Sequence, residues 1–424
     1  MDADQLLSEV TNFYLASKDF NGYPCYHIRG TTRMTVDELR PILAELVSRG
    51  VIALVFGDRH PNPHIRAFSD EPVAQQLAKL EKSTLEHTYL YPTKKHLLGV
   101  VDRSEYQDRP YTLELALGAG QLEFRVFDLA VLEIYRNDPR YSYQNDDIRG
   151  YISISDEYYL SPDVPERDKV LLETFGFAYD DDLNRAVAVF CIYLNRLSPE
   201  HQQIWRSKEL QGSYKLHPDY FRNSILGDWG EGMSIFNAFL EELRIINRMC
   251  DLMGRPKLFR NDFEDNRPRN FSFLVRPTLN EYNAFVHTLD KMMSDNISKK
   301  FFMGEVSDEI EEERGDGKIV VRQRGTISML EEWLGRNFRL SDPKPMSDLI
   351  NAFKTVRKKR QKPAHSLKPD TFDQKYIHKQ RELIIEAYGA IRTIRLVFAN
   401  HPQVRVADDL GIPDVLYRGR IWTY

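Results

Sequence analysis

The sequence predicts an α+β protein built from three parts. Helical periodicity followed by a strand-like apolar run fills residues 1–87, short strands and turns fill residues 88–275, and long amphipathic helices dominate residues 276–424. A chain of 424 residues also exceeds the usual size of one domain. We therefore expect a small N-terminal module, a mixed middle domain and a C-terminal helical bundle, with boundaries at those residues.

The N-terminal module begins with two predicted helices. Apolar residues recur at helical spacing over residues 6–14, and again after the capping box that Thr35 and Glu38 can form. The apolar run at residues 51–56 predicts a strand. Residues 65–68, beyond a proline-rich turn, can return as a second strand.

This order of helix, helix, strand, turn and strand resembles a winged helix, a fold that contacts duplex DNA in some proteins and docks other proteins elsewhere. The helix that would face DNA carries Asp37, Glu38 and Glu45 beside Arg40 and Arg49. Carboxylates on that face oppose contact with phosphates. We therefore favour docking or scaffolding over DNA binding for this module, and expect a protein partner or inhibitor there.

The middle domain has the pattern of a mixed α+β fold. Its expected strands cover residues 111–117, 122–127, 151–154, 174–179 and 186–193, the last two joined as a hairpin through Asp180, Asp181 and Asp182. Ser198 and Pro199 supply the cap and first residue of a helix. A longer amphipathic helix is predicted over residues 235–253.

The C-terminal part changes to helices. The predicted helices cover residues 278–297, 326–336, 345–361 and 371–400. Their wide apolar stripes need partner helices, so we expect an antiparallel four-helix bundle. The Asp316-Gly317 dipeptide, after the acidic run at residues 309–313, indicates a β-hairpin inserted between the first two helices.

Composition excludes several classes of function. The 58 Lys and Arg residues against 63 Asp and Glu give a net charge of −5, so any nucleic-acid site must be local. Cys25, Cys191 and Cys250 form no CxxC pair, which speaks against a disulfide framework or a cysteine zinc site. No phosphate-binding glycine motif, signal peptide or membrane-length apolar run is present. We expect a cytoplasmic protein with no cofactor, no metal and no membrane partner.

The basic stretch at residues 353–365 is the most informative part of the sequence. Arg360 lies seven positions after the apolar Phe353 and so returns to the buried side of the predicted helix. On an unbroken helix, His365 would point about 140° away from Arg360. Pro363 ends or bends the helix, because its ring clashes with the carbonyl four residues earlier. Arg360 and His365 can therefore converge.

An Arg and a His separated by four residues, late in a helix of a bundle, resemble the R-x4-6-H motif of the HEPN superfamily. The resemblance implies an endoribonuclease that needs no metal, formed as a homodimer through two facing bundles. It assigns the scissile phosphate to Arg360 and general acid or base catalysis at the ribose 2′-hydroxyl to His365, leaving 2′,3′-cyclic phosphate ends. Gln361 departs from the pattern, since Asn, Asp or His often follows this arginine and some family members are non-catalytic.

Two functions are therefore expected. The first is RNA cleavage by a bacterial defence or toxin effector, in which the basic flank binds RNA through Lys354, Arg357, Lys358, Lys359 and Lys362. The alternative is a non-catalytic adaptor or docking subunit of a nucleic-acid-associated complex. If the protein is a nuclease, we expect the side chains of Arg360 and His365 to face a shared groove that solvent can reach. An Arg360 bound by an acidic neighbour, with His365 hydrogen-bonded inside its own loop, favours the adaptor.

Overall fold

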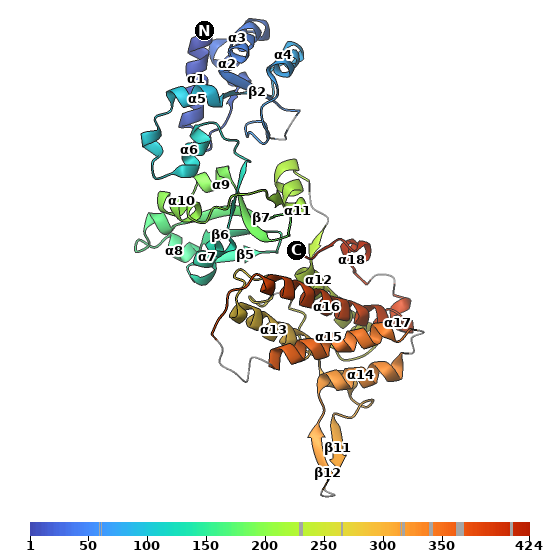
Figure 1. The fold of residues 1–424 in the computed structure, drawn as a ribbon. Helices are drawn as coiled ribbons and strands as arrows, with labels where there is room; N and C mark the ends of the chain where they lie inside the picture. The colour runs from blue at the N-terminus through green and yellow to red at the C-terminus, as the bar shows by residue number, and fades with distance from the viewer. Residues whose placement is uncertain are drawn as a thin grey trace. The chain divides into compact units, whose positions relative to one another are not determined.

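A computed structural model gives the fold. It describes residues 1–58, 60, 62–228, 232–263, 266–313, 315, 319–338, 342–361, 369–407 and 410–424. The α+β class is confirmed, and the chain divides into two compact units, Met1–Gly230 and Glu231–Tyr424 (Figure 1). The sequence pattern had placed its boundaries after residues 87 and 275 instead.

The first unit begins with a three-stranded antiparallel sheet and its helices. Its elements are α1 (Ala3–Ala16), β1 (Tyr23–Pro24), α2 (Cys25–Thr32), α3 (Val36–Ser48), β2 (Ile52–Phe56), α4 (Val73–Lys82) and β3 (Thr88–Pro92), with strand order β1-β3-β2. The predicted capping box at Thr35 is confirmed at the start of α3. Leu6, Leu39, Leu54 and Leu90 are at most 3% exposed and form part of one core.

The predicted strand at residues 65–68 is wrong, because β3 is the partner of β2. The N–H of Arg66 donates to the side-chain oxygen of Gln121 at 2.8 Å, and its guanidinium lies 4.6 Å from the ring centre of Tyr91. The N–H of Ile65 donates to the carbonyl of Asn62, and the carbonyl of Arg66 accepts from the N–H of Leu122. Turn and loop hydrogen bonds thus replace the ladder that a strand would form. The first sheet consequently extends beyond residue 87.

The rest of the first unit is built on a larger antiparallel sheet of order β4-β8-β7-β6-β5, with β9 on β7. Its strands are β4 (Phe124–Phe127), β5 (Tyr141–Asn145), β6 (Arg149–Ile154), β7 (Leu171–Tyr179), β8 (Arg185–Phe190) and β9 (Lys215–Leu216). Its helices are α5 (Lys94–Val100), η1 (Arg103–Tyr106), α6 (Pro110–Ala116), η2 (Leu129–Leu132), α7 (Glu133–Asn137), α8 (Asp156–Tyr159), η3 (Glu166–Asp168), α9 (Cys191–Asn195), α10 (Pro199–Arg206), α11 (Pro218–Phe221) and η4 (Arg222–Leu226).

Local signals in this region succeeded more often than they failed. The hairpin of β7 and β8 and the helix capped by Ser198 are confirmed. The strand predicted at residues 111–117 is wrong, because α6 occupies it. Pro110 presets the first turn, and Tyr111 and Leu115, one helical turn apart, are both fully buried.

The second unit is largely helical. Its elements are β10 (Met233–Ser234), α12 (Ile235–Leu252), α13 (Leu279–Met293), η5 (Lys299–Phe302), β11 (Glu309–Glu313), β12 (Ile319–Gln323), α14 (Thr326–Asn337), α15 (Lys344–Gln361), α16 (Lys375–Phe398), α17 (Pro402–Arg405), α18 (Asp414–Arg418) and β13 (Ile421–Trp422). The long helix α16 packs against α12, α15 and α13. All four predicted helices are present, and α12, which the sequence assigned to the middle domain, completes this packing.

The second unit also carries the β-hairpin that the sequence predicts. β11 and β12 pair in antiparallel register from Glu309 opposite Gln323 to Glu313 opposite Ile319, and the hairpin extends away from the helices beyond α14 (Figure 1). The predicted turn at Asp316 and Gly317 lies outside the described residues.

None of the helices described in either unit is both long and apolar enough to cross a membrane.

Candidate nucleic-acid site at the end of α15

The apolar face of α15 fixes where its basic residues lie. Leu349, Ile350, Phe353 and Val356 are at most 3% exposed and face the other helices. Arg360 follows on the same side, as the helical spacing predicted, and its side chain is 28% exposed at the edge of the bundle. Its guanidinium contacts the C-terminal part of α13.

Two arginines of α15 and two aspartates of the α13 region form what we call the arginine–aspartate cluster, namely Arg357, Arg360, Asp290 and Asp295. Arg357 Nε donates to Asp290 Oδ1 at 3.0 Å and its Nη2 to Asp295 Oδ1 at 2.7 Å. Arg360 Nη1 donates to Asp290 Oδ2 at 2.7 Å and to Asp295 Oδ2 at 2.6 Å. Each carboxylate therefore binds both guanidinium groups.

Local backbone geometry brings the two carboxylates together. Asp290 lies in the last turns of α13, and the N–H groups of Ser294 and Asp295 both donate to its carbonyl oxygen, at 2.8 and 3.2 Å. The chain therefore turns sharply after α13 and returns Asp295 to the same place. On α15, Arg357 and Arg360 are three residues apart and share one helix face.

Burial of Asp290 makes the loss of its arginine partners costly. The Asp290 side chain is 0% exposed, and a buried carboxylate without a partner is strongly unfavourable. Asp295 is 40% exposed. Partial burial raises its pKa, but the hydrogen bond from Arg360 and the charges of Arg357 and Arg360 outweigh burial and hold the pKa below its usual value.

Arg360 keeps part of its donor set available. Only Nη1 is bound by the two aspartates, while Nε and Nη2 make no hydrogen bond with any residue that the structure describes. A guanidinium offers a planar fork of donors that matches two phosphate oxygens. The aspartates therefore hold the orientation of Arg360 and leave one edge of that fork open.

The other predicted binding residues differ in their surroundings. Lys354 Nζ pairs with Glu331 of α14 at 2.9 Å, and both side chains are about half exposed. Lys358 is exposed and Lys359 half-buried, and neither forms an ion pair within the described residues. Lys362 and His365 lie outside the described residues. The catalytic hypothesis depends on the distance between Arg360 and His365, and the described residues do not give that distance.

The local positive charge is smaller than the sequence predicted. The described basic residues of α15 in this region are Lys354, Arg357, Lys358, Lys359 and Arg360. Three carboxylates, those of Glu331, Asp290 and Asp295, pair with three of them. Five positive charges against three negative ones leave an excess of two, so attraction of a polyanion rests mainly on Lys358 and Lys359.

Sequence reasoning missed every contribution of α13. The neighbours of Asp290 on the buried side are Val286, Leu289 and Met293. A carboxylate at an apolar position of an amphipathic helix is the one signal that could have indicated a buried ion pair, because such a charge needs a partner. The same helix also brings His287 and Lys291 beside the cluster.

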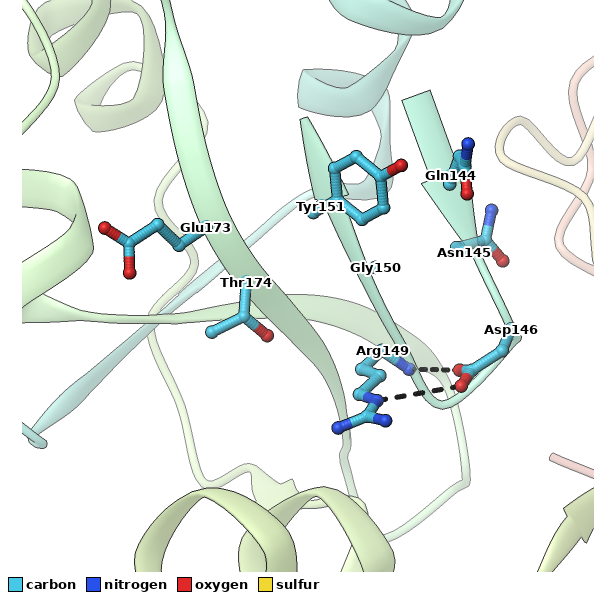
Figure 2. Close-up of a pocket in the computed structure, with 8 residues that line it drawn as sticks. All are labelled: Gln144, Asn145, Asp146, Arg149, Gly150, Tyr151, Glu173 and Thr174. Carbon is cyan, nitrogen blue, oxygen red and sulfur yellow. Dashed lines mark hydrogen bonds and ion pairs between the residues drawn. The ribbon is translucent and has the colours of Figure 1, made fainter. Parts of the chain in front are cut away.

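A separate cavity lies on the larger sheet of the first unit. It has a volume of about 430 Å³ and is lined by Gln144, Asn145, Asp146, Arg149, Gly150, Tyr151, Glu173 and Thr174 (Figure 2). Beside the cavity, the register of β6 on β7 shifts between Gly150 and Ile152, as at a β-bulge. Asp146 pairs with Arg149 at 3.7 Å at one end of the cavity. Of the residues predicted to act on RNA, none of those that the structure describes lines it.

Comparison with known proteins adds no relative to these observations. No family model, no curated protein and no solved structure matches the chain. Within the described ranges, no three His, Cys, Asp or Glu side chains are grouped as a metal site requires. Function must therefore be argued from the geometry of the cluster.

Proposed function

We propose that the second unit is a HEPN-type endoribonuclease in which Arg360 binds the scissile phosphate and His365 acts as general acid or base. The observation that supports this proposal most is the state of Arg360. Asp290 and Asp295 hold Nη1, while Nε and Nη2 remain open at the solvent-facing edge of the bundle. A preorganised cation at the edge of a fold stabilises developing negative charge without further ordering.

The chemistry needs only groups of the protein and the RNA. A base removes the proton of the 2′-hydroxyl, the 2′-oxygen bonds to phosphorus, and the bond from phosphorus to the 5′-oxygen breaks. The electron pair of that bond goes to the 5′-oxygen, which takes a proton from an acid. Arg360 would offset the charge on the non-bridging oxygens. The products are a 2′,3′-cyclic phosphate and a 5′-hydroxyl.

The remaining parts are assigned supporting roles. We propose that two copies associate through the bundle and that the enzyme serves bacterial defence or acts as a toxin. The order α1, β1, α2, α3, β2, α4 and β3, with the sheet β1-β3-β2, supports a winged-helix-like module at the N-terminus in which α4 separates β2 from β3. Acidic Asp37 and Glu38 on the exposed part of α3 favour protein docking there over DNA contact.

The test is cleavage of a synthetic RNA by the full chain with a chelator present. The proposal predicts cyclic phosphate ends, and a loss of about 10²-fold or more in rate for His365→Ala. Circular dichroism of each variant checks that the fold is kept. An intact RNA with the wild-type chain, or an equal rate with His365→Ala, would contradict the proposal.

One observation favours the adaptor as a second candidate. The aspartates that bind Arg357 and Arg360 offset the charge that would attract RNA, and a carboxylate-bound Arg360 is one of the two features expected of an adaptor. The other feature concerns His365, outside the described residues. An adaptor would leave RNA intact and purify with a stable partner, which size-exclusion chromatography with light scattering would detect.

A further inference from the structure

A second histidine lies beside Arg360 within the described part of the chain. His287 is exposed on α13, one helical turn before Asp290, and Asp290 binds Arg360 at 2.7 Å. Lys291 lies one turn after His287 on the same helix. No residue that the structure describes forms a hydrogen bond or ion pair with the His287 ring. His287 therefore lies where α13 meets α15, near enough to Arg360 for the guanidinium charge to act on its ring.

The charges around His287 come from both helices and from the turn after α13. Arg360 approaches from α15, Lys291 and Asp290 belong to α13, and Asp295 follows it. Partial desolvation and then the charges of Arg360 and Lys291 lower the pKa of His287, while the two aspartates oppose this effect. A lowered pKa favours the neutral imidazole, which is the form that accepts a proton.

We propose that His287 is the general base of the reaction, an inference that rests on the proposed ribonuclease function. Its free ring nitrogen takes the 2′-hydroxyl proton as the 2′-oxygen attacks phosphorus beside Arg360. His365 then donates the proton that the leaving 5′-oxygen takes up, so each imidazole makes one transfer. The role fits the position of an exposed histidine one helical turn from Asp290, the carboxylate that orients Arg360.

The test compares His287→Ala with His378→Ala in RNA cleavage across pH. His378 is an exposed histidine of α16 outside this site and serves as the matched control. The wild-type rate should rise as pH increases through the pKa of His287. His287→Ala should lose that rise and about 10²-fold or more in rate, with added imidazole restoring part of it, while His378→Ala should match the wild type.

The outcomes separate this inference from the function on which it depends. If the wild-type chain cuts RNA and His287→Ala cuts at the same rate with the same pH profile, the role of His287 is overturned and the ribonuclease stands. If the wild-type chain leaves RNA intact, both are overturned. Because His287 is exposed, the variant should keep the wild-type circular dichroism spectrum and melting temperature, which excludes misfolding as the cause of a lost rate.

Discussion

Two arginine–carboxylate sites in the second unit differ in what surrounds them. Arg395 of α16 pairs with Glu242 of α12 where the helices pack, with side chains 4% and 0% exposed. In the arginine–aspartate cluster only Asp290 is sealed from solvent, while Arg357 and Arg360 are 33% and 28% exposed. A sealed pair can serve only the fold. A half-open one can serve the fold through its aspartate and a ligand through its arginine.

Breaking the sealed pair should have the strongest effect on stability. Arg395→Met leaves the carboxylate of Glu242 buried without its cation, which costs about 3–5 kcal/mol. The double variant with Glu242→Leu removes both charges and should recover most of the loss. Urea unfolding of the single and double variants measures this, and equal midpoints for the two would contradict it.

Removing one carboxylate charge from the arginine–aspartate cluster should lower stability less than breaking the sealed pair does, and it should clearly lower activity. Asp290→Asn keeps the shape of the side chain but removes the charge that both arginines bind, which we expect to cost about 1–3 kcal/mol. Arg360 would then be held by Asp295 alone and less firmly oriented, so the cleavage rate should fall while RNA affinity is nearly kept. The control is Glu331→Gln, which affects only the exposed partner of Lys354.

The two sites should also respond to pH in opposite directions. The lowered pKa of Asp295 adds stability that is complete above the unfolded-state value of about 3.9 and is lost as pH falls through the native value. Burial raises the pKa of Glu242 despite Arg395, so its contribution declines as pH rises above about 4.3. The free energy of unfolding can be measured across pH for both variants. Asp295→Asn should no longer lose stability in acid, and Glu242→Gln should no longer lose stability as pH rises. Curves that parallel the wild type would contradict both assignments.

The smallest effects belong to the exposed lysines of α15. Lys354→Ala should change stability by about 0–1 kcal/mol, because its pair with Glu331 is solvent-exposed. Lys358 has no carboxylate partner in the described ranges, so Lys358→Ala should weaken RNA binding more than Lys354→Ala does. Filter binding at several salt concentrations measures this. The slope of the logarithm of the binding constant against the logarithm of the salt concentration should fall in magnitude by about 0.7 for each lost contact to single-stranded RNA. Equal affinities of the two variants would count against it.

Local signals predicted much of the fold. Caps and apolar periodicity located the start of α3 after Thr35, the start of α10 after Ser198, and α12 to within one residue of its observed bounds, because these signals act within a few residues. The failure at residues 65–68 depended on distant partners, Gln121 and Tyr91, whereas the failure at 111–117 overlooked the helix start that Pro110 supplies. A short apolar segment is compatible with strand or helix until its neighbours are known.

Of the two helices that form the candidate site, the sequence predicted the part on α15 but not the part on α13. The spacing from Phe353 placed Arg360 toward the bundle, and the structure confirms that placement. Its partners Asp290 and Asp295 are 70 and 65 residues away in the sequence, so no local pattern joins them to Arg360. The packing of α13 on α15 supplies that information, and it also brings His287 to the same edge.

The most direct test of the open guanidinium edge is the cleavage rate of a synthetic RNA by wild-type, Arg360→Lys and Arg360→Ala chains, each with chelator present. A lysine keeps the charge but not the fork of donors. We expect both variants to stay folded, because Arg357 still binds Asp290 and Asp295. Both should be slowed by about 10²-fold or more, as for removal of one oriented donor from a transition-state site. Cleavage at the wild-type rate by Arg360→Ala would show that this arginine serves the fold alone.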